Sequence, residues 1–568
     1  MNEAKLTDRV PATPSSSGIQ CVAQKLKTTV LSIDFANQET GRYFNFTNIP
    51  YALPPTGDRR FRAPLAIESK SSMLDNGSIG HICPQAYPDW ITISGEFMQA
   101  YLLGESFDEG AAWGSLATQP PPPPDPRVSE DCLVLDVLVP EKVWDAVSSG
   151  QTPQAEVLVW IYGGGFVFGS KDFWGNPAGL IEASRSNGRD GIIYVAMNYR
   201  VGAFGFLAGP SLQADGAANA GLLDQHLALQ WVQDNIHLFG GSKDRVTVMG
   251  ESAGGASIMH HLTAFGALNG PPLFSRAIVQ SPGSQPQPGA KKQEDAHLAF
   301  LELLNVSSIE EARMLPSDVL IEANEKQISA SKYGIFAYGS TPDGFFAPDF
   351  PTRMLVQGSH FKDIEVLVSH NTNEGLTLVN PGFQNSTDAE TERLFEELIR
   401  AQFPSVSSDI VQHILQTLYP PIYDGSQGYT DTVERISEYI GDAILKNTAN
   451  AISRAYGNAS YAYEYSIGPA LHADDVPYTF FNGASSRVPA PGRALELQEY
   501  LTTFAIHGVP SSGRATEFPT YGTGVLKIQD DGYSVVADST ANERNTWWQK
   551  TLCKFLAASS CERIQANE

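Results

Sequence analysis

The fold is decided by the stretch Val246-Thr247-Val248-Met249-Gly250-Glu251-Ser252-Ala253-Gly254-Gly255. Its first four residues are typical of a buried strand, and the small residues after Ser252 suit a helix that starts close to that strand. A strand that ends in Gly-x-Ser-x-Gly predicts a nucleophile elbow, which is a strained strand-to-helix turn that lifts the serine hydroxyl clear of the sheet. The free N–H groups of the helix then point at any charge that develops beside Ser252.

Other short apolar runs indicate the rest of the sheet. Runs without polar alternation are typical of strands that are buried on both faces of a parallel sheet. The clearest helical pattern between them is Ala220–Leu238, which Gly240-Gly241 stops. Strands that alternate with helices predict an α/β fold with a large, mainly parallel sheet, whose sites lie at the carboxyl ends of the strands. The runs are Cys132–Val139, Val157–Tyr162, Ile192–Met197, Val246–Met249, Ala277–Gln280 and Ile364–Val368.

The chain shows no linker that would divide its 568 residues into domains. The Pro-rich run at 119–126 is short and reads as a stiff surface loop. The segments 381–457 and 493–507 read as helical, and we expect them to wall a pocket. We therefore expect a polar N-terminal tail at 1–25 and a single catalytic domain at 26–568.

Composition limits the partners of the chain. A net charge of −25 makes nucleic acid an improbable partner, because an acidic surface repels phosphate backbones. The sequence contains no run of 18 apolar residues, so no membrane span is predicted. We expect a monomer or a homodimer. The first 17 residues lack the apolar core of a secretory signal, which predicts a cytoplasmic protein, or a secreted one if a signal was removed. The five cysteines form no Cys-x-x-Cys pair, so a zinc site is not expected.

A nucleophilic serine needs N–H donors for the oxyanion that forms when it attacks a carbonyl. The glycines Gly163, Gly164 and Gly165 follow the predicted strand Val157–Tyr162 directly, and glycine lets a backbone turn its N–H groups toward a ligand. The alternative is an ordinary flexible loop. A further donor is expected at Ala253, the residue after the nucleophile.

The serine also needs a base and an acid that orients the base. In this kind of fold the chain order is serine, then acid, then histidine. Glu374 lies just beyond the strand Ile364–Val368 and is the candidate acid, although a surface glutamate would look the same. The histidines after it are His413, His472 and His507. His472 follows the strand-like Tyr461–Ser466 in a loop, where a base belongs, and His507 is its main competitor.

With these residues in place, the chain resembles the type-B carboxylesterase/lipase family, the cholinesterase-like branch of the α/β hydrolases, and is most similar to its fungal esterases. The matching blocks extend over most of the sequence. They include Asn48–Pro55, Ser129–Leu133, Gly163–Phe166, Asn198–Gly202, Gly221–Gln225, the elbow at Ser252, Asn373–Gly375, His472 and Phe504-Ala505.

The resemblance implies an α/β-hydrolase fold with helical insertions around an active-site gorge. It implies a triad of Ser252, Glu374 and His472, with oxyanion donors at Gly164, Gly165 and Ala253. Glu251 and Ser281 match residues that lie behind the histidine in this family. Glu251 would either favour the charged histidine or accept backbone N–H bonds.

Other features follow from the same resemblance or depart from it. It suggests a disulfide between Cys83 and Cys132 that closes a long loop, whereas no family motif indicates whether Cys553 and Cys561 pair. Neither Trp90 nor Trp113 in that loop aligns with the tryptophan that binds quaternary ammonium groups in cholinesterases, so choline esters are not predicted as substrates.

The expected function is hydrolysis of a small or medium uncharged carboxylic ester through an acyl-enzyme, without metal or organic cofactor. Acyl transfer or lactone formation would use the same triad, and a lipase acting on longer acyl chains is a further alternative. A catalytically silent adhesion or scaffold protein is disfavoured, because such relatives usually lose part of the triad.

Overall fold

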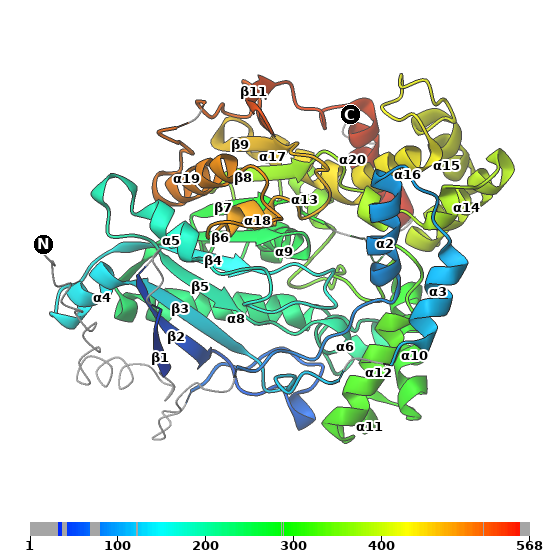
Figure 1. Cartoon of the computed structure of the whole chain (residues 1–568). Helices are drawn as coiled ribbons and strands as arrows, with labels where there is room; N and C mark the ends of the chain where they lie inside the picture. Colours follow the sequence, from blue (N-terminus) through cyan, green and yellow to red (C-terminus); the bar gives the residue numbers. More distant parts are fainter. Residues whose placement is uncertain are drawn as a thin grey trace, which may run out of the picture.

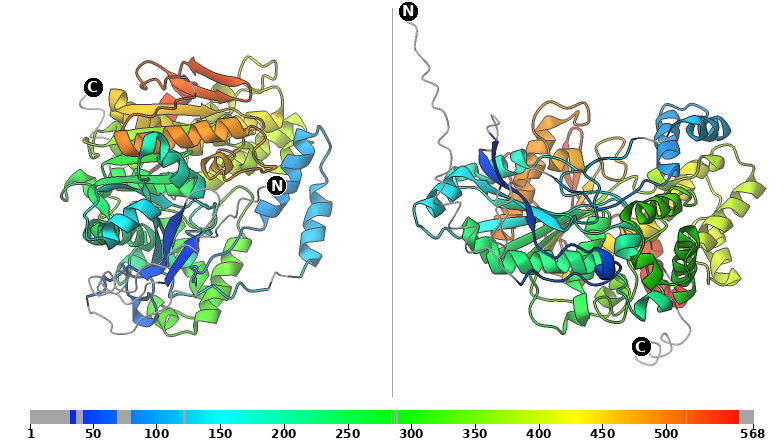
Figure 2. Two further views of the ribbon diagram at one scale, coloured as in Figure 1. Left: turned by 60° about the vertical axis from the view of Figure 1, so that its left-hand side comes forward. Right: turned by 90° about the horizontal axis from the view of Figure 1, so that it is seen from below.

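The computed structural model describes residues 32–36, 42–68, 80–120, 123–283, 285, 287, 289–514 and 516–556. Within these ranges one eleven-stranded sheet has the order β1-β2-β3-β5-β4-β6-β7-β8-β9-β10-β11, and Figure 1 shows it crossing the molecule from β1 to β11. Helices lie on both faces of the sheet (Figure 2). The predicted α/β fold is confirmed. The predicted tail at 1–25 lies outside the described residues.

The centre of the sheet is parallel and buried. The pairs from β5 through β4, β6, β7, β8 and β9 to β10 are all parallel, and every residue of β5 is buried. Burial on both faces explains the apolar runs in the sequence. The strands are β4 (Ala155–Ile161), β5 (Ile193–Met197), β6 (Gly241–Glu251), β7 (Arg276–Gln280), β8 (Glu365–Asn371), β9 (Ser460–Tyr465) and β10 (Val525–Gln529).

Antiparallel strands form both edges. The run Cys132–Val139 is a strand, β3 (Val134–Pro140), but it pairs antiparallel with β2 and β5 rather than joining the parallel set. A strand at this position is almost completely buried whether it runs parallel or antiparallel to its neighbours, so the apolar run alone does not reveal its direction. The other edge strands are β1 (Ser32–Ala36), β2 (Tyr43–Pro50) and β11 (Gly532–Val536).

The predicted helices are present. The pattern Ala220–Leu238 becomes α8 (Ala220–Asn235) and a short 3-10 turn, which ends where Gly240 takes a φ of 87°. No helix in the described ranges is long and apolar enough to cross a bilayer. The other helices outside the two predicted helical segments are α4 (Glu141–Ser148), α5 (Ala178–Ser184), α6 (Gly202–Phe206), α7 (Pro210–Gln213), α9 (Ala253–Leu262), α10 (Ala290–Leu304), α11 (Ile309–Arg313), α12 (Ser317–Ser329), α13 (Pro351–Val356), α18 (Val476–Thr479) and α20 (Glu543–Leu556).

Most of the predicted helical segment 381–457 packs around a second apolar core. Phe395, Ile436 and Trp548 are fully buried there. Phe97 joins them from α2 (Trp90–Leu102), which Figure 1 shows beside α16. The predicted loop between Cys83 and Cys132 thus carries two helices, because apolar side chains of α2 find a core to fill. The other helices of this part are α3 (Glu109–Thr118), α14 (Asp388–Gln402), α15 (Ser408–His413) and α16 (Thr432–Ile440). The helices α17 (Asn447–Tyr456) and α19 (Pro491–His507) instead bury their apolar side chains in the main core.

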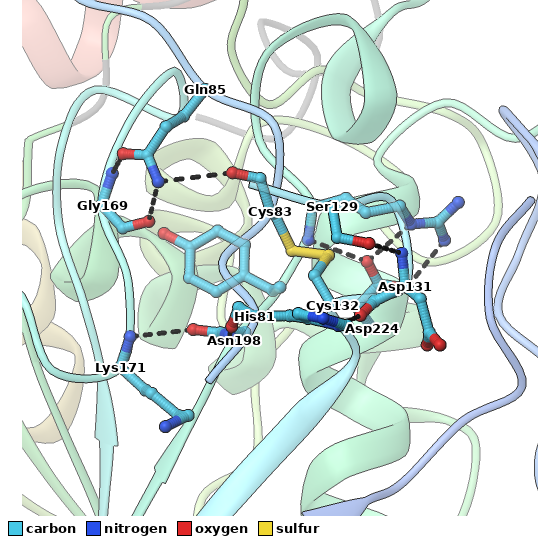
Figure 3. Close-up of a disulfide and its surroundings, with 12 residues drawn as sticks. His81, Cys83, Gln85, Ser129, Asp131, Cys132, Gly169, Lys171, Asn198 and Asp224 are labelled. Atoms are coloured by element: carbon cyan, nitrogen blue, oxygen red, sulfur yellow. Dashed lines mark hydrogen bonds and ion pairs between the residues drawn. A yellow bond between two sulfur atoms is a disulfide. The ribbon is translucent and has the colours of Figure 1, made fainter. Parts of the chain in front are cut away.

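A disulfide joins Cys83 to Cys132, as the resemblance suggested, and both cysteines are buried. Figure 3 shows how its surroundings are held: the Gln85 amide donates to the carbonyl oxygens of Cys83 and Gly169 and accepts the N–H of Gly169. The segment that carries Cys83 is therefore hydrogen-bonded to the loop that follows the three glycines. Cys561 lies outside the described residues, so whether Cys553 and Cys561 pair stays open.

Removing this bridge should destabilise the fold. It closes a segment of 49 residues, and a loop of that length corresponds to about 4 kcal/mol of unfolding free energy in the chain-entropy model. We expect urea denaturation to show that the double variant Cys83→Ala/Cys132→Ala has a free energy of unfolding lower by most of that amount. A reductant should lower the stability of the parent protein and leave the variant unchanged; equal stability of the two oxidised proteins would contradict the role of the bridge.

Candidate active site

Ser252 occupies the predicted turn between β6 and α9. Its backbone has φ 55° and ψ −121°, a conformation that is strained for a residue with a side chain. Glycine is required beside it, because a Cβ on Gly254 would lie 2.0 Å from the carbonyl oxygen of Ile161. The structure therefore confirms the strained strand-to-helix turn, and Ser252 lines a cavity above it.

His472 lies in the loop after β9 and reaches this serine. Its Nε2 is 2.8 Å from Ser252 Oγ, and its Nδ1 is 2.6 Å from Glu374 Oε2. The loop is fixed on both sides, since Asp474 accepts the N–H of Leu471 and Asn371 donates its amide to the Leu471 carbonyl. The imidazole can thus take a proton from the serine hydroxyl while its other nitrogen stays bound.

The two competing histidines lie elsewhere. His413 ends α15 and packs against Trp547, with ring centroids 5.3 Å apart. His507 is the last residue of α19, at the end of the helix where a cation is favoured. Neither residue lines the cavity at Ser252.

Glu374 follows β8 and is completely buried. Its Oε1 accepts the backbone N–H of Asn371 at 2.7 Å, so its second oxygen faces His472. Burial acts against the charge, but His472, the Asn371 N–H and the Ser281 hydroxyl together keep the pKa of Glu374 below its usual value. The carboxylate is therefore charged at neutral pH and holds the Nδ1 proton of His472 in place.

Glu251, the residue before the serine, is also buried and lines the cavity. Its Oε1 lies 3.5 Å from His472 Nε2, and within the described residues its carboxyl oxygens accept no hydrogen bond. Burial raises the pKa of Glu251 to about 8. Of the two roles considered for this residue, the geometry fits an electrostatic effect on His472 rather than acceptance of backbone N–H bonds.

Burial also disfavours the charged form of His472, but Glu374 and Glu251 outweigh it and raise the pKa of His472 to about 9. Since a base must be neutral to accept a proton, activity should rise with pH as the imidazolium disappears.

The glycine loop follows β4 and borders the same cavity. Gly164 and Gly165 have φ values of 121° and 60°. A Cβ on Gly165 would meet the ring of Phe336 at 2.3 Å, so this position excludes a side chain. In the part of the chain that the structure describes, the N–H groups of Gly164, Gly165 and Ala253 donate to no protein acceptor. They are free to bind an oxyanion.

The cavity above Ser252 has a volume of about 230 Å³ and mostly apolar walls. Trp90 and Phe336 form one side, with their rings 5.4 Å apart at a steep angle. Their polar groups face the protein, since Trp90 Nε1 donates to the Ile335 carbonyl and Gln285 Oε1 accepts the Phe336 N–H. Trp113 donates to Glu109 on α3 and does not line the cavity. The wall residues come from distant segments and carry no motif, which is why sequence reasoning did not select Phe336.

The eleven-stranded sheet, the strained serine turn and the histidine at the carboxyl ends of the strands together define an α/β hydrolase.

Comparison with known proteins leads to the same class of protein. The model of the Carboxylesterase family matches residues 32–548. "Carboxylesterase patB" of Aspergillus clavatus is 40% identical over 524 residues, which are 90% of this chain and 93% of that protein. The protein of the same name from Penicillium expansum is 39% identical over 527 residues, covering 90% and 92%. The crystal structure of Aspergillus niger EstA superposes with a TM-score of 0.73 at 24% identity, over 92% of this chain and 97% of that one.

The chain belongs to the carboxylesterase family. It is a serine ester hydrolase, and the resemblance drawn from the sequence motifs is confirmed.

Proposed function

We propose that this protein hydrolyses small or medium uncharged carboxylic esters through an acyl-enzyme formed on Ser252. The observation that carries the proposal is the pair of short hydrogen bonds that links Ser252 through His472 to Glu374 at the floor of an apolar cavity. A further line of support is the family match over residues 32–548, which also fits one catalytic domain at 26–568.

In the first step, His472 Nε2 accepts the hydroxyl proton while Ser252 Oγ attacks the ester carbonyl carbon. The carbonyl π electrons move onto the oxygen, and the oxyanion is bound by the N–H groups of Gly164, Gly165 and Ala253. One such donor is worth about 3 kcal/mol. Glu374 remains ionised and stabilises the imidazolium that forms.

The tetrahedral intermediate collapses when the C–O bond to the alcohol breaks and His472 gives its proton to the leaving oxygen. Water then enters, His472 removes one of its protons, and attack on the acyl carbonyl releases the carboxylic acid and regenerates Ser252. An alcohol or amine in place of water would give acyl transfer, and no feature of the cavity favours that alternative.

The cavity supports a compact substrate. A cavity of about 150 Å³ accommodates benzene, so the 230 Å³ here suits one ring or a short chain beside the ester group. The walls are apolar and the protein carries a net charge of −25, which disfavours anionic esters.

Substrate choice is tested with 4-nitrophenyl acetate, butyrate, benzoate, octanoate and palmitate, with products identified by mass spectrometry. We expect kcat/KM to be highest for acetate, butyrate or benzoate and to fall for octanoate. The variant Phe336→Ala should shift the preference toward octanoate, whereas Phe345→Ala, at an exposed phenylalanine, should not. Highest activity on palmitate, with activation at an oil–water interface, would instead identify a lipase.

The pH profile tests the role of Glu251. Glu251 is ionised above its pKa of about 8, which is the range in which His472, with a pKa of about 9, loses its proton. The variant Glu251→Gln removes this negative charge 3.5 Å from His472 Nε2, so the pKa of His472 should fall. We expect the acidic limb of kcat/KM to move to lower pH, by about one unit. The exposed Glu397→Gln serves as the control and should leave the profile unchanged. An acidic limb that stays in place or moves to higher pH would contradict the electrostatic role.

A further inference from the structure

A second cavity, of about 320 Å³, lies at the far end of the helix that begins after Ser252. His261, in the last turn of α9, lines it together with His226 of α8, Ala264, Phe265, Asn269 and residues 271–274. Since α9 has ten residues, about 15 Å separate this cavity from Ser252. The proposed reaction does not use it.

The wall of this cavity contains unusual backbone. Phe265, Gly266 and Ala267 have consecutive φ values of 54°, 70° and 57°, in the left-handed region that residues with side chains rarely adopt. The strain is held by a hydrogen bond from the Phe265 N–H to the Phe346 carbonyl. Strained backbone that the surrounding structure maintains is more frequent at ligand sites than elsewhere.

Aromatic rings surround the two histidines. His226 stacks on His261 with centroids 6.2 Å apart, and Phe265 and Phe346 present their rings to His226 at steep angles. Burial lowers the pKa of both histidines, so both rings are neutral at neutral pH. The cavity therefore offers a flat, uncharged guest aromatic contacts without a fixed charge.

The hydrogen bonds behind His261 determine its tautomer. Ser257 Oγ donates to the Ala253 carbonyl and therefore accepts from Gln225 Nε2. This orients the Gln225 amide so that its Oε1 faces His261 Nε2 at 3.1 Å, and that nitrogen must carry the proton. Nδ1 of His261 is then an acceptor. Within the described ranges neither this nitrogen nor the ring of His226 has a hydrogen-bond partner.

We propose that this cavity is a second binding site, for a neutral aromatic compound that carries a hydroxyl group, and that its occupant modulates hydrolysis. The ring of such a phenol would pack among the aromatic side chains, and its O–H would donate to His261 Nδ1. A neutral phenol matches the neutral imidazoles, whereas a charged guest would be buried without a counter-ion.

The same hydrogen bonds give the site a connection to the reaction. They lead from His261 through Gln225 and Ser257 to the carbonyl of Ala253, and all four residues are buried. A donor at Nδ1 polarises the Nε2–H, and hydrogen bonds in a chain polarise one another. The carbonyl of Ala253 belongs to the peptide unit after the one that carries the Ala253 N–H, so the chain acts on this N–H, a proposed oxyanion donor, by fixing the position of the residue. This half of the inference rests on the proposed function.

Binding is tested with 4-fluorophenol by ¹⁹F NMR titration of the full chain, with fluorobenzene for comparison. We expect saturable binding of the phenol, which Asn269→Trp abolishes by filling the cavity from its exposed rim and Asn269→Ala leaves intact. His261→Phe should weaken binding of the phenol about three- to tenfold and leave fluorobenzene unaffected, because it removes the acceptor Nδ1. His226→Phe keeps an aromatic ring at the other histidine and serves as the matched control, with both compounds bound as in the parent protein. Binding that survives Asn269→Trp unchanged, or no binding at all, would overturn the site.

Modulation is tested by measuring kcat with saturating 4-nitrophenyl butyrate. We expect saturating 4-fluorophenol to change kcat about twofold or more in the parent protein, but not in Asn269→Trp. The variant Ser257→Ala interrupts the hydrogen-bond chain, so it should still bind the phenol but lose the effect on kcat. A phenol that only raises KM would be a competitor at Ser252 and would refute the modulation. If the protein hydrolyses no ester, the proposed function fails, but the NMR titration still decides the site.

Discussion

Replacing Ser252 by alanine should remove almost all ester hydrolysis, lowering kcat by a factor on the order of 10⁴ to 10⁶. The variant loses the oxygen that lies 2.8 Å from His472 Nε2, and with it the proposed nucleophile. Residual activity would come from the N–H donors and from substrate binding. The measurement is single-turnover or steady-state hydrolysis of 4-nitrophenyl butyrate.

The control for this variant is Ser149→Ala, at the exposed serine that follows α4. It should keep full activity, and both variants should unfold at the temperature of the parent protein. A folded Ser252→Ala protein that retains more than a few per cent of kcat would show that another residue is the nucleophile.

Glu374→Gln should lower kcat about 10³- to 10⁴-fold without unfolding the protein. Its Oε1 position receives the Asn371 N–H, so the glutamine oxygen must occupy that side and the NH₂ group must face His472. The amide would then donate to Nδ1 and force the proton onto Nε2. An imidazole protonated at Nε2 cannot accept the hydrogen of Ser252.

The control here is Glu397→Gln, at an exposed glutamate of α14. It keeps the fold and should keep the rate. Activity of Glu374→Gln close to that of the parent protein would contradict the orienting role, and loss of folding would show a structural role instead. Circular dichroism of both variants separates these outcomes.

The parallel core of the sheet could be predicted from sequence because burial on both faces leaves continuous apolar runs. Five of the six predicted runs lie in the parallel strands β4 to β8. The strands β10 and β11 were not predicted. The strand β11 is only partly buried and therefore carries no such apolar run. Whether β3 runs parallel or antiparallel depends on its neighbours and is not encoded in its own residues.

The active site likewise has parts that could be predicted from the sequence and parts that could not. The serine turn and the glycine loop could be predicted, because only small residues fit the backbone conformations that they require. Glu374 and His472 were predicted from their positions after strands, and the structure brings both together with Ser252. The wall formed by Trp90 and Phe336 depends on how distant segments pack, so the shape of the cavity could not be predicted. Whether the protein is a monomer or a homodimer stays a prediction.

Covalent labelling decides whether Ser252 is the nucleophile. The protein is treated with a fluorophosphonate, digested and analysed by peptide mass spectrometry, with Ser252→Ala in parallel. We expect one adduct, on the Oγ of Ser252, formed in step with loss of hydrolysis and absent from the variant. Loss of activity with the adduct on another residue and Ser252 unmodified would contradict it.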